Sequence, residues 1–142
     1  MLTAARLLAL DVGARRIGVA VSDHAGLLAH PLSTLEARGP FRDAEAVAAL
    51  CSAEEAGGVI VGLPAHADGT ESASAARARR LGDALRARGI DVDYQDEWGS
   101  SVDGEAALGH VKAGRREKGD VDRAAAVAIL TAYLEARRRS AP

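Results

Sequence analysis

The chain has 142 residues, of which 48% are hydrophobic and only 3% aromatic, and 18 Lys and Arg against 20 Asp and Glu give a net charge of -2. This length fits one domain of ordinary size, so we expect residues 1–142 to form a single domain. The scarcity of aromatic rings argues against the stacking platform that single-strand binding proteins use, and the charge balance provides no overall attraction to nucleic acid.

The cysteine count and the hydropathy of the sequence indicate the compartment in which the protein acts. Cys51 is the single cysteine, which excludes an internal disulfide and a multi-cysteine zinc site and fits a reducing cytoplasm. No stretch reaches the roughly 18 apolar residues of a membrane span, and the first residues lack the apolar run of a signal peptide. We therefore expect a cytoplasmic protein that acts without a membrane.

The first half of the chain predicts a hairpin, a further strand and a helix. Residues 6–22 form two apolar segments joined by a short turn that contains glycine, which is typical of a β-hairpin. A third strand is expected over 29–35. The segment 41–56 spaces Ala, Val and Leu as a helix does, and Gly57 and Gly58 end it.

The second half alternates strands and helices. The continuous apolar run at 59–64 is typical of a strand that is covered on both faces. A helix over 72–88 and a strand over 90–95 follow. The remaining segments are expected, in order, as a short helix at about 101–110, a basic loop at 112–119 and a well-buried helix at 121–138.

This order of elements predicts an α/β fold. The initial strands pair as antiparallel neighbours, and the later strand, helix, strand units add parallel strands, so the five strands form one mixed sheet flanked by helices. In open sheets of this kind the functional site lies at the carboxyl ends of the parallel strands.

Acidic residues stand at three places that such a sheet brings to one edge. Asp11 ends the first strand, Asp96 and Glu97 follow the last strand, and Asp120 and Asp122 open the final helix. Neighbours on a strand, and residues two apart on a helix, point in different directions, so only one of each pair faces the site. The alternative roles are ordinary ones, with Asp11 in turn chemistry and Asp122 as a helix cap or first-turn acid.

Converging carboxylates repel one another, and a divalent cation relieves that repulsion. An all-oxygen ligand set suits Mg²⁺ or Mn²⁺, which complete their shells with water and substrate phosphate. Zinc would require His or Cys, and the four histidines show no metal-ligand spacing among themselves: His24, His30, His66 and His110.

Four segments of the chain carry a resemblance to a known family. They are LDVGARRIGVAVSD at 10–23, VIVGLPAHADGT at 59–70, QDEW at 95–98 with Ser100 and Ser101, and VDRAAAVAILTAYL at 121–134. In this order, and nearly from end to end of the chain, they are similar to the YqgF family. Its members are described as pre-16S rRNA nucleases or as Holliday junction resolvases, and they have an RNase H-like fold.

The resemblance implies roles for individual residues. It makes Asp11, Glu97 and Asp122 the catalytic carboxylates that bind metal, and so selects Glu97 over Asp96 and Asp122 over Asp120. The chain departs from the family pattern after Glu97, where Trp98, Gly99, Ser100 and Ser101 replace Arg, Leu and two threonines. That change removes an arginine able to bind phosphate in a bidentate manner.

Together these observations predict a Mg²⁺- or Mn²⁺-dependent nuclease that hydrolyses phosphodiester bonds, with its carboxylates as ligands rather than nucleophiles. The expected substrate is structured or single-stranded RNA, specifically the 5′ end of precursor 16S rRNA, bound by a monomer or a weak homodimer. The candidate nucleic-acid-binding residues are Arg15, Arg16, Thr70, Trp98, Ser100, Ser101, Arg115, Arg116 and Lys118.

Three alternatives to this function stay open. One is a Holliday junction resolvase, which would cut branched DNA as a dimer. Another is a non-catalytic RNA-binding factor in ribosome maturation, suggested by the altered 98–101 segment. The third is an ATP-binding protein, because the Asp11-Val12-Gly13 hairpin also resembles the phosphate-binding hairpin of the sugar kinase and actin superfamily, although 142 residues lack the second such domain.

Overall fold

The computed structural model describes residues 1–64, 72–96 and 118–140. The expected short helix at 101–110 and most of the basic segment 112–119 lie outside these ranges. The elements, in chain order, are β1 (Leu8–Val12), β2 (Arg16–Ser22), β3 (Ala29–Glu36), α1 (Pro40–Glu54), β4 (Val59–Leu63), α2 (Ala73–Ala87), β5 (Val92–Asp96) and α4 (Lys118–Ser140).

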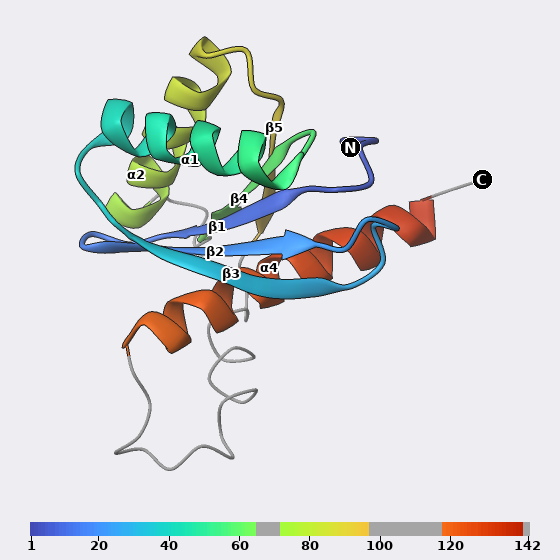
Figure 1. The fold of residues 1–142 in the computed structure, drawn as a ribbon. Coiled ribbons are helices and arrows are strands. Elements are labelled where there is room, and N and C mark those ends of the chain that lie inside the picture. Colours follow the sequence, from blue (N-terminus) through green and yellow to red (C-terminus); the bar gives the residue numbers. More distant parts are fainter. Residues whose placement is uncertain (65–71, 97–117, 141–142) are drawn as a thin grey trace.

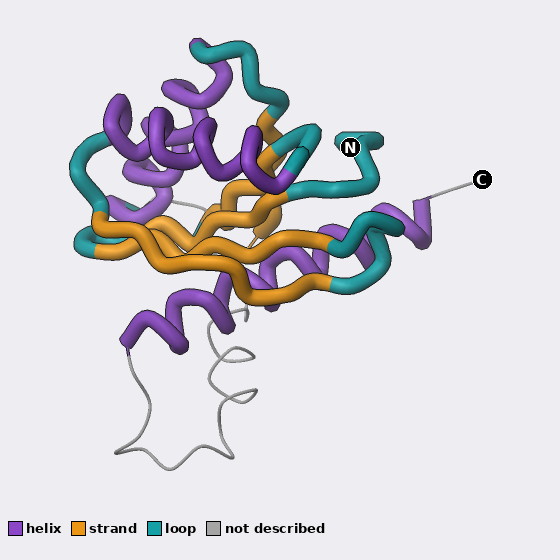
Figure 2. The backbone as a smooth tube through the Cα atoms, viewed as in Figure 1, coloured by secondary structure: helices purple, strands orange, loops and turns teal. Residues whose placement is uncertain are grey.

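The five strands form one mixed sheet in the order β3-β2-β1-β4-β5. The pairs β1/β2 and β2/β3 are antiparallel, whereas β1/β4 and β4/β5 are parallel. Helices α1 and α2 cover one face, and α4 runs across the other (Figures 1 and 2). The predicted α/β fold with antiparallel strands followed by parallel strands is confirmed.

Two aliphatic clusters, one on each face, hold the sheet between its helices. Alternate residues of β1 and β2 pack against α1 and α2, among them Leu8, Leu10 and Ile17. The residues between them, such as Ala9 and Ala20, pack against α4. Because side chains of a strand alternate between faces, these clusters show toward which face of the sheet each hairpin side chain points. None of the helices in the described ranges is long and apolar enough to span a membrane.

The starts of α4 and β5 differ from the sequence expectation. Helix α4 begins at Lys118, three residues before the predicted start, and its first turn is closed by an ion pair between Asp120 and Arg123 at i,i+3 spacing. Strand β5 begins at Val92 rather than at residue 90, because the N–H of Ile90 still bonds the carbonyl of Leu85 at the end of α2. The earlier helix start places Asp122 in the second turn of α4.

The buried Tyr133 links α4 by hydrogen bonds to the sheet and to the N-terminal residues. Tyr133 donates a hydrogen bond to Oδ2 of Asp93 on β5 and accepts one from the backbone N–H of Leu2, both at 2.7 Å. Burial, reinforced by the bond to the Asp93 carboxylate, raises the pKa of Tyr133 to about 12. The hydroxyl is thus held in its neutral form across the physiological range.

We predict that Tyr133→Phe lowers the free energy of unfolding by about 1–3 kcal/mol, because two partners lose a partly buried hydrogen bond while the ring is kept. Urea unfolding of the two proteins measures this difference. The pKa of Tyr133 in the folded protein lies above its ordinary value of 10. The difference in free energy of unfolding between wild type and variant is therefore complete below pH 10 and decreases as the pH rises toward 12. Equal unfolding midpoints at pH 7 would contradict the role of the hydroxyl.

Candidate active site

The register of the β1–β2 hairpin places Asp11 beside a glycine. Asp11 pairs with Gly18, between the pairs Leu10 with Val19 and Val12 with Ile17. Directly opposite residues of antiparallel strands share a face, and the packing of Ala9 and Ala20 on α4 shows that this face is the α4 side. The half-buried Asp11 side chain therefore points to the side of the sheet on which α4 lies.

Helix α4 lies very close to the sheet at Gly18. A Cβ atom added to Gly18 would lie 1.9 Å from the backbone carbonyl oxygen of Asp122 and 3.0 Å from the backbone nitrogen of Arg123. No side chain fits in that space, so a glycine is required here. The contact sets the backbone of Asp122 directly against the residue that pairs with Asp11, although 111 positions separate Asp11 and Asp122 in the sequence.

An ion pair fixes the side chain of Asp122. Arg16, the first residue of β2, donates from Nε to Oδ2 of Asp122 at 2.7 Å. The side chains are 35% and 20% exposed, so the pair lies at the rim of the sheet rather than in the core. Arg16 occupies the same face as Gly18 by strand alternation. Hence Asp11, Arg16 and Asp122 share one face at the carboxyl end of β1.

The neighbouring acid, Asp120, is directed elsewhere. It pairs with Arg123, and Arg123 also donates to the hydroxyl of Thr34 on β3 at 2.9 Å. Asp120 and Asp122 thus have separate sets of partners, and the choice of Asp122 over Asp120 for the site stays a prediction. Arg15 lies exposed at the turn between β1 and β2, beside the same edge.

Several predicted site residues lie outside the described ranges. They are Thr70, Glu97, Trp98, Ser100, Ser101, Arg115 and Arg116. Lys118 begins α4, but its side chain is likewise outside what the structure describes. Within the described part, no three His, Cys, Asp or Glu side chains come together as a metal site. The described centre is therefore a pair of carboxylates with one guanidinium.

A family model described as "RuvX: Holliday junction resolvase" matches residues 5–136. The chain belongs to the RuvX family. Curated relatives of this RuvX-family chain are named "putative pre-16S rRNA nuclease". The protein from Anaeromyxobacter sp. is 40% identical over 93% of the chain and 98% of its own length. The protein from Thermus thermophilus is 40% identical over 91% and 96%. The family is thus one of nucleases, as the YqgF resemblance implied.

Solved structures confirm the RNase H-like fold of the RuvX-family chain. Thermus thermophilus RuvC, solved in complex with a Holliday junction substrate, aligns with a TM-score of 0.62 and 16% identity over 96% of this chain and 97% of RuvC. The Fowlpox virus resolvase, solved with Holliday junction DNA, aligns with a TM-score of 0.54 and 11% identity over 93% and 98%. These likenesses establish the fold.

We predict that Gly18→Ala lowers the free energy of unfolding by about 1–3 kcal/mol, because the added methyl group forces α4 away from β2. Urea unfolding measures the change. Gly119→Ala is the matched control, since its Cβ meets only side-chain atoms, at 3.2 Å or more, and alanine favours a helix over glycine. Equal stabilities for Gly18→Ala and Gly119→Ala would contradict the close approach.

Proposed function

We propose that this RuvX-family chain is a divalent-metal-dependent nuclease that matures the 5′ end of precursor 16S rRNA. The observation that carries the proposal is the meeting of Asp11 and Asp122 on one face, through the Asp11–Gly18 pair and the contact of Gly18 with α4. The names of the curated relatives support precursor 16S rRNA as substrate. Carboxylates at a strand end and on a crossing helix are a ligand set for hydrolysis of phosphodiesters.

The described residues fit a hard divalent cation. Asp122 already binds a positive group, the guanidinium of Arg16, and Asp11 faces the same side. We propose Glu97 as the third carboxylate. Asp93 bonds Tyr133 of α4, so Asp93 and Gln95 are the α4-facing positions of β5, and Glu97 is the next position of that alternation in the sequence. Mg²⁺ or Mn²⁺ suits such oxygen ligands.

Each residue of the site has a separate task in phosphodiester hydrolysis. Bound Mg²⁺ or Mn²⁺ would activate water and stabilise the leaving oxygen. Asp11 and Asp122, with Glu97, would hold the cation. Before the cation binds, Arg16 holds Asp122 through Nε, and its side chain makes no other hydrogen bond among the described residues, so its terminal N–H groups remain to contact phosphate. The exposed Arg15 reaches the substrate backbone beside it.

A junction resolvase is the second candidate function. The description of the family model names that activity, and the structural neighbours were solved with junction DNA. RNA is the better substrate on physical grounds, because a domain with a net charge of -2 makes few phosphate contacts. A resolvase must also hold two duplex arms as a symmetric dimer, whereas a monomer suffices for a flexible RNA leader.

We predict that the purified protein cleaves the 5′ leader of precursor 16S rRNA faster than a DNA four-way junction. Both substrates are incubated side by side with Mg²⁺ and then with Mn²⁺, and initial rates are compared. Symmetric cutting of the junction by a stable dimer that leaves the leader intact would establish the resolvase instead. Binding of the leader with no cleavage in either metal would favour the non-catalytic RNA-binding factor.

We predict that Asp11→Asn, Glu97→Gln and Asp122→Asn each reduce the cleavage rate by at least about a hundredfold, because each removes one ligand charge. Asp96→Asn and Asp120→Asn are the matched controls and stay within about threefold of the wild type, since Asp120 pairs with Arg123 away from the site. Circular dichroism verifies that every variant is folded. A variant of the first group with full activity would remove its residue from the site.

Metal replacement provides a further prediction. Chelation abolishes cleavage, and added Mg²⁺ or Mn²⁺ restores it. Ca²⁺ competes for binding yet supports little turnover, because its longer and more variable coordination misplaces the water. Rates are measured after dialysis against chelator and titration with each cation. Cleavage that survives exhaustive chelation would refute a metal-dependent mechanism.

A further inference from the structure

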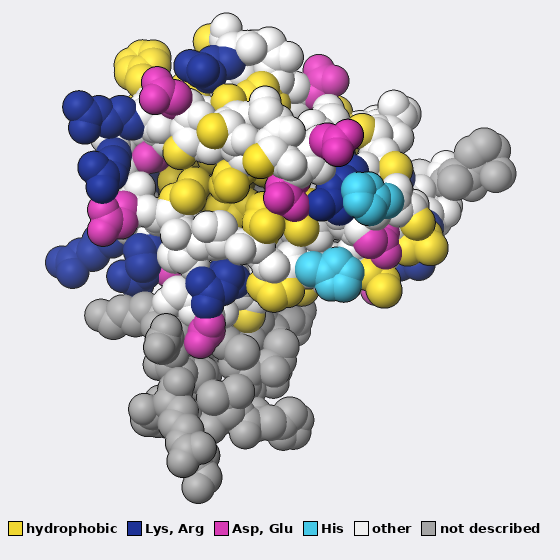
Figure 3. All heavy atoms as spheres, in the orientation of Figure 1, with side chains coloured by type: hydrophobic (Ala, Val, Ile, Leu, Met, Phe, Trp, Pro, Cys, Tyr) yellow, Lys and Arg dark blue, Asp and Glu magenta, His cyan; other side chains and the backbone are white. Residues whose placement is uncertain are grey.

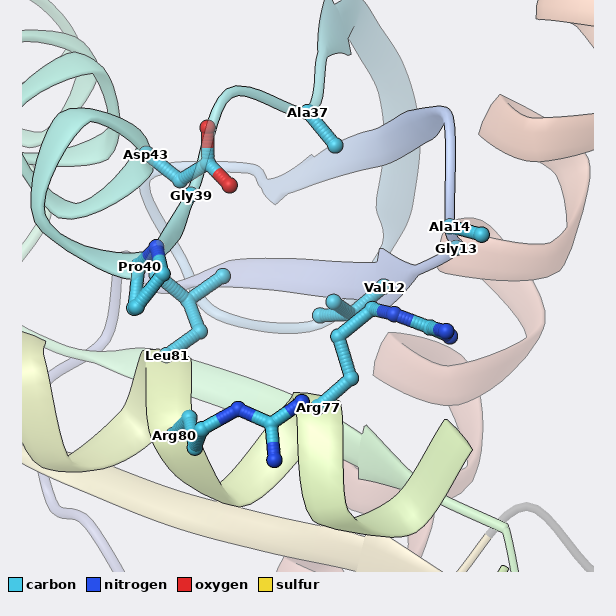
Figure 4. Close-up of a pocket in the computed structure, with 10 residues that line it drawn as sticks. All are labelled: Val12, Gly13, Ala14, Ala37, Gly39, Pro40, Asp43, Arg77, Arg80 and Leu81. Atoms are coloured by element: carbon cyan, nitrogen blue, oxygen red, sulfur yellow. The ribbon is translucent and has the colours of Figure 1, made fainter. Parts of the chain in front are cut away.

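A pocket opens on the opposite face of the sheet from the carboxylates, at the same edge. Its volume is about 200 Å³, and its walls come from the β1–β2 turn, the start of α1 and the first half of α2 (Figure 4). The turn contributes Gly13 and Ala14, and α2 contributes Arg77 and Arg80. We refer to it as the Arg77–Arg80 pocket. Gly13 stands two residues after Asp11, so the pocket adjoins the candidate active site.

The Arg77–Arg80 pocket carries surplus positive charge. Among the described residues, neither guanidinium has an ion pair or a hydrogen bond, in contrast to Arg16 and Arg123. One acidic side chain lines the pocket, that of Asp43. It is only 7% exposed, and its Oδ1 accepts the backbone N–H of Arg38 at 2.8 Å, which closes the turn before α1. Two unpaired arginines therefore outweigh one engaged carboxylate.

An apolar groove continues from this pocket. It lies between α1 and α2, has a volume of about 360 Å³, and shares Pro40 and Arg80 with the pocket. Its wall includes Phe41, the single phenylalanine of the chain, which is 82% exposed. The fold thus presents an apolar ring to solvent in a groove that is also lined by the free guanidinium of Arg80 and by Asp83.

We propose that the pocket and the groove bind one nucleotide of a single-stranded RNA, with the phosphate on Arg77 and Arg80 and the base stacked on Phe41. A single strand alternates charged phosphates with flat apolar bases, and this surface offers the two complementary features side by side. Guanidinium groups bind phosphate in a bidentate manner, and aromatic rings stack on any base. This inference rests on the proposed function, because the strand is the one that Asp11 and Asp122 would cut.

The position of the subsite fits a strand that passes around the β1–β2 turn. Figure 3 shows Lys and Arg side chains gathered along the edge where that turn and the start of α1 lie. A strand leaving the carboxylate face crosses this edge to reach the Arg77–Arg80 pocket. A base inside a duplex is stacked and cannot cover Phe41, so the subsite selects single-stranded substrate over duplex arms.

Fluorescence anisotropy with a labelled single-stranded RNA of about 12 nucleotides tests the subsite, in chelator so that no cleavage occurs. Arg77→Ala with Arg80→Ala should weaken binding about tenfold and reduce the slope of log affinity against log salt by about one to two units. Phe41→Ala should weaken binding about five- to tenfold and leave that slope unchanged. The affinity for a blunt RNA duplex should not depend on Phe41.

The matched control is Arg138→Ala with Arg139→Ala, which removes the same charge from exposed positions in the last turn of α4. This variant should bind the RNA within about twofold of the wild type. The subsite alone would be overturned if the Arg77/Arg80 and Arg138/Arg139 double variants lost the same RNA affinity, or if the Phe41→Ala variant bound RNA like the wild type. A wild-type protein that neither binds nor cleaves RNA would instead overturn the proposed function.

Discussion

The close approach of α4 to β2 at Gly18 determines the geometry of the candidate site. The carbonyl oxygen of Asp122 lies only 1.9 Å from the position that a Cβ atom of residue 18 would take, and Gly18 is the cross-strand partner of Asp11. A larger residue would separate the helix from the sheet and move Asp122 away from the β1 edge. The register of one hairpin and the absence of one side chain therefore bring together two acids that are far apart in the sequence.

The aliphatic core makes this geometry rigid. Ala9 and Ala20 on the sheet, and Ala126 on the helix, are fully buried in the cluster between the sheet and α4. Small side chains permit a short distance between helix and sheet, and Tyr133 anchors the far half of α4 to β5 and to the chain start. The same alternation along β1 and β2 assigns the other face to α1 and α2. The sheet edge at the β1–β2 turn therefore has the carboxylates of Asp11 and Asp122 on its α4 face and the free guanidinium groups of Arg77 and Arg80 on the opposite face.

Local patterns in the sequence were sufficient to predict most of the fold. The hairpin, the buried strand β4, helix α2 and the long final helix all carry short-range signals, and the side chain of Ser72 accepts the backbone N–H of Ala75 at the start of α2. The helix start was predicted three residues late, because the ion pair that closes it joins Asp120 to Arg123 on a surface without apolar periodicity. The resemblance to the YqgF family, rather than periodicity, distinguished Asp122 from Asp120.

The features that sequence reasoning missed are long-range ones. Arg16 and Asp122 are 106 positions apart, and no spacing rule joins them, so Arg16 was assigned only to nucleic acid. The Arg77–Arg80 pocket depends on how α2 packs beside the β1–β2 turn, which no local pattern in the sequence shows. The contact with α4 is what requires a glycine at position 18, and no local pattern in the sequence shows that contact.

Anomalous diffraction from crystals soaked in Mn²⁺ tests the central claim most directly, because it locates the ion without reference to any activity. The meeting of Asp11 and Asp122 predicts an anomalous peak within ligand distance of both carboxylates, with Arg16 displaced from Oδ2 of Asp122. The peak should vanish in the Asp122→Asn variant. A saturating soak that leaves Arg16 bound to Asp122 and places Mn²⁺ away from Asp11 would contradict the account.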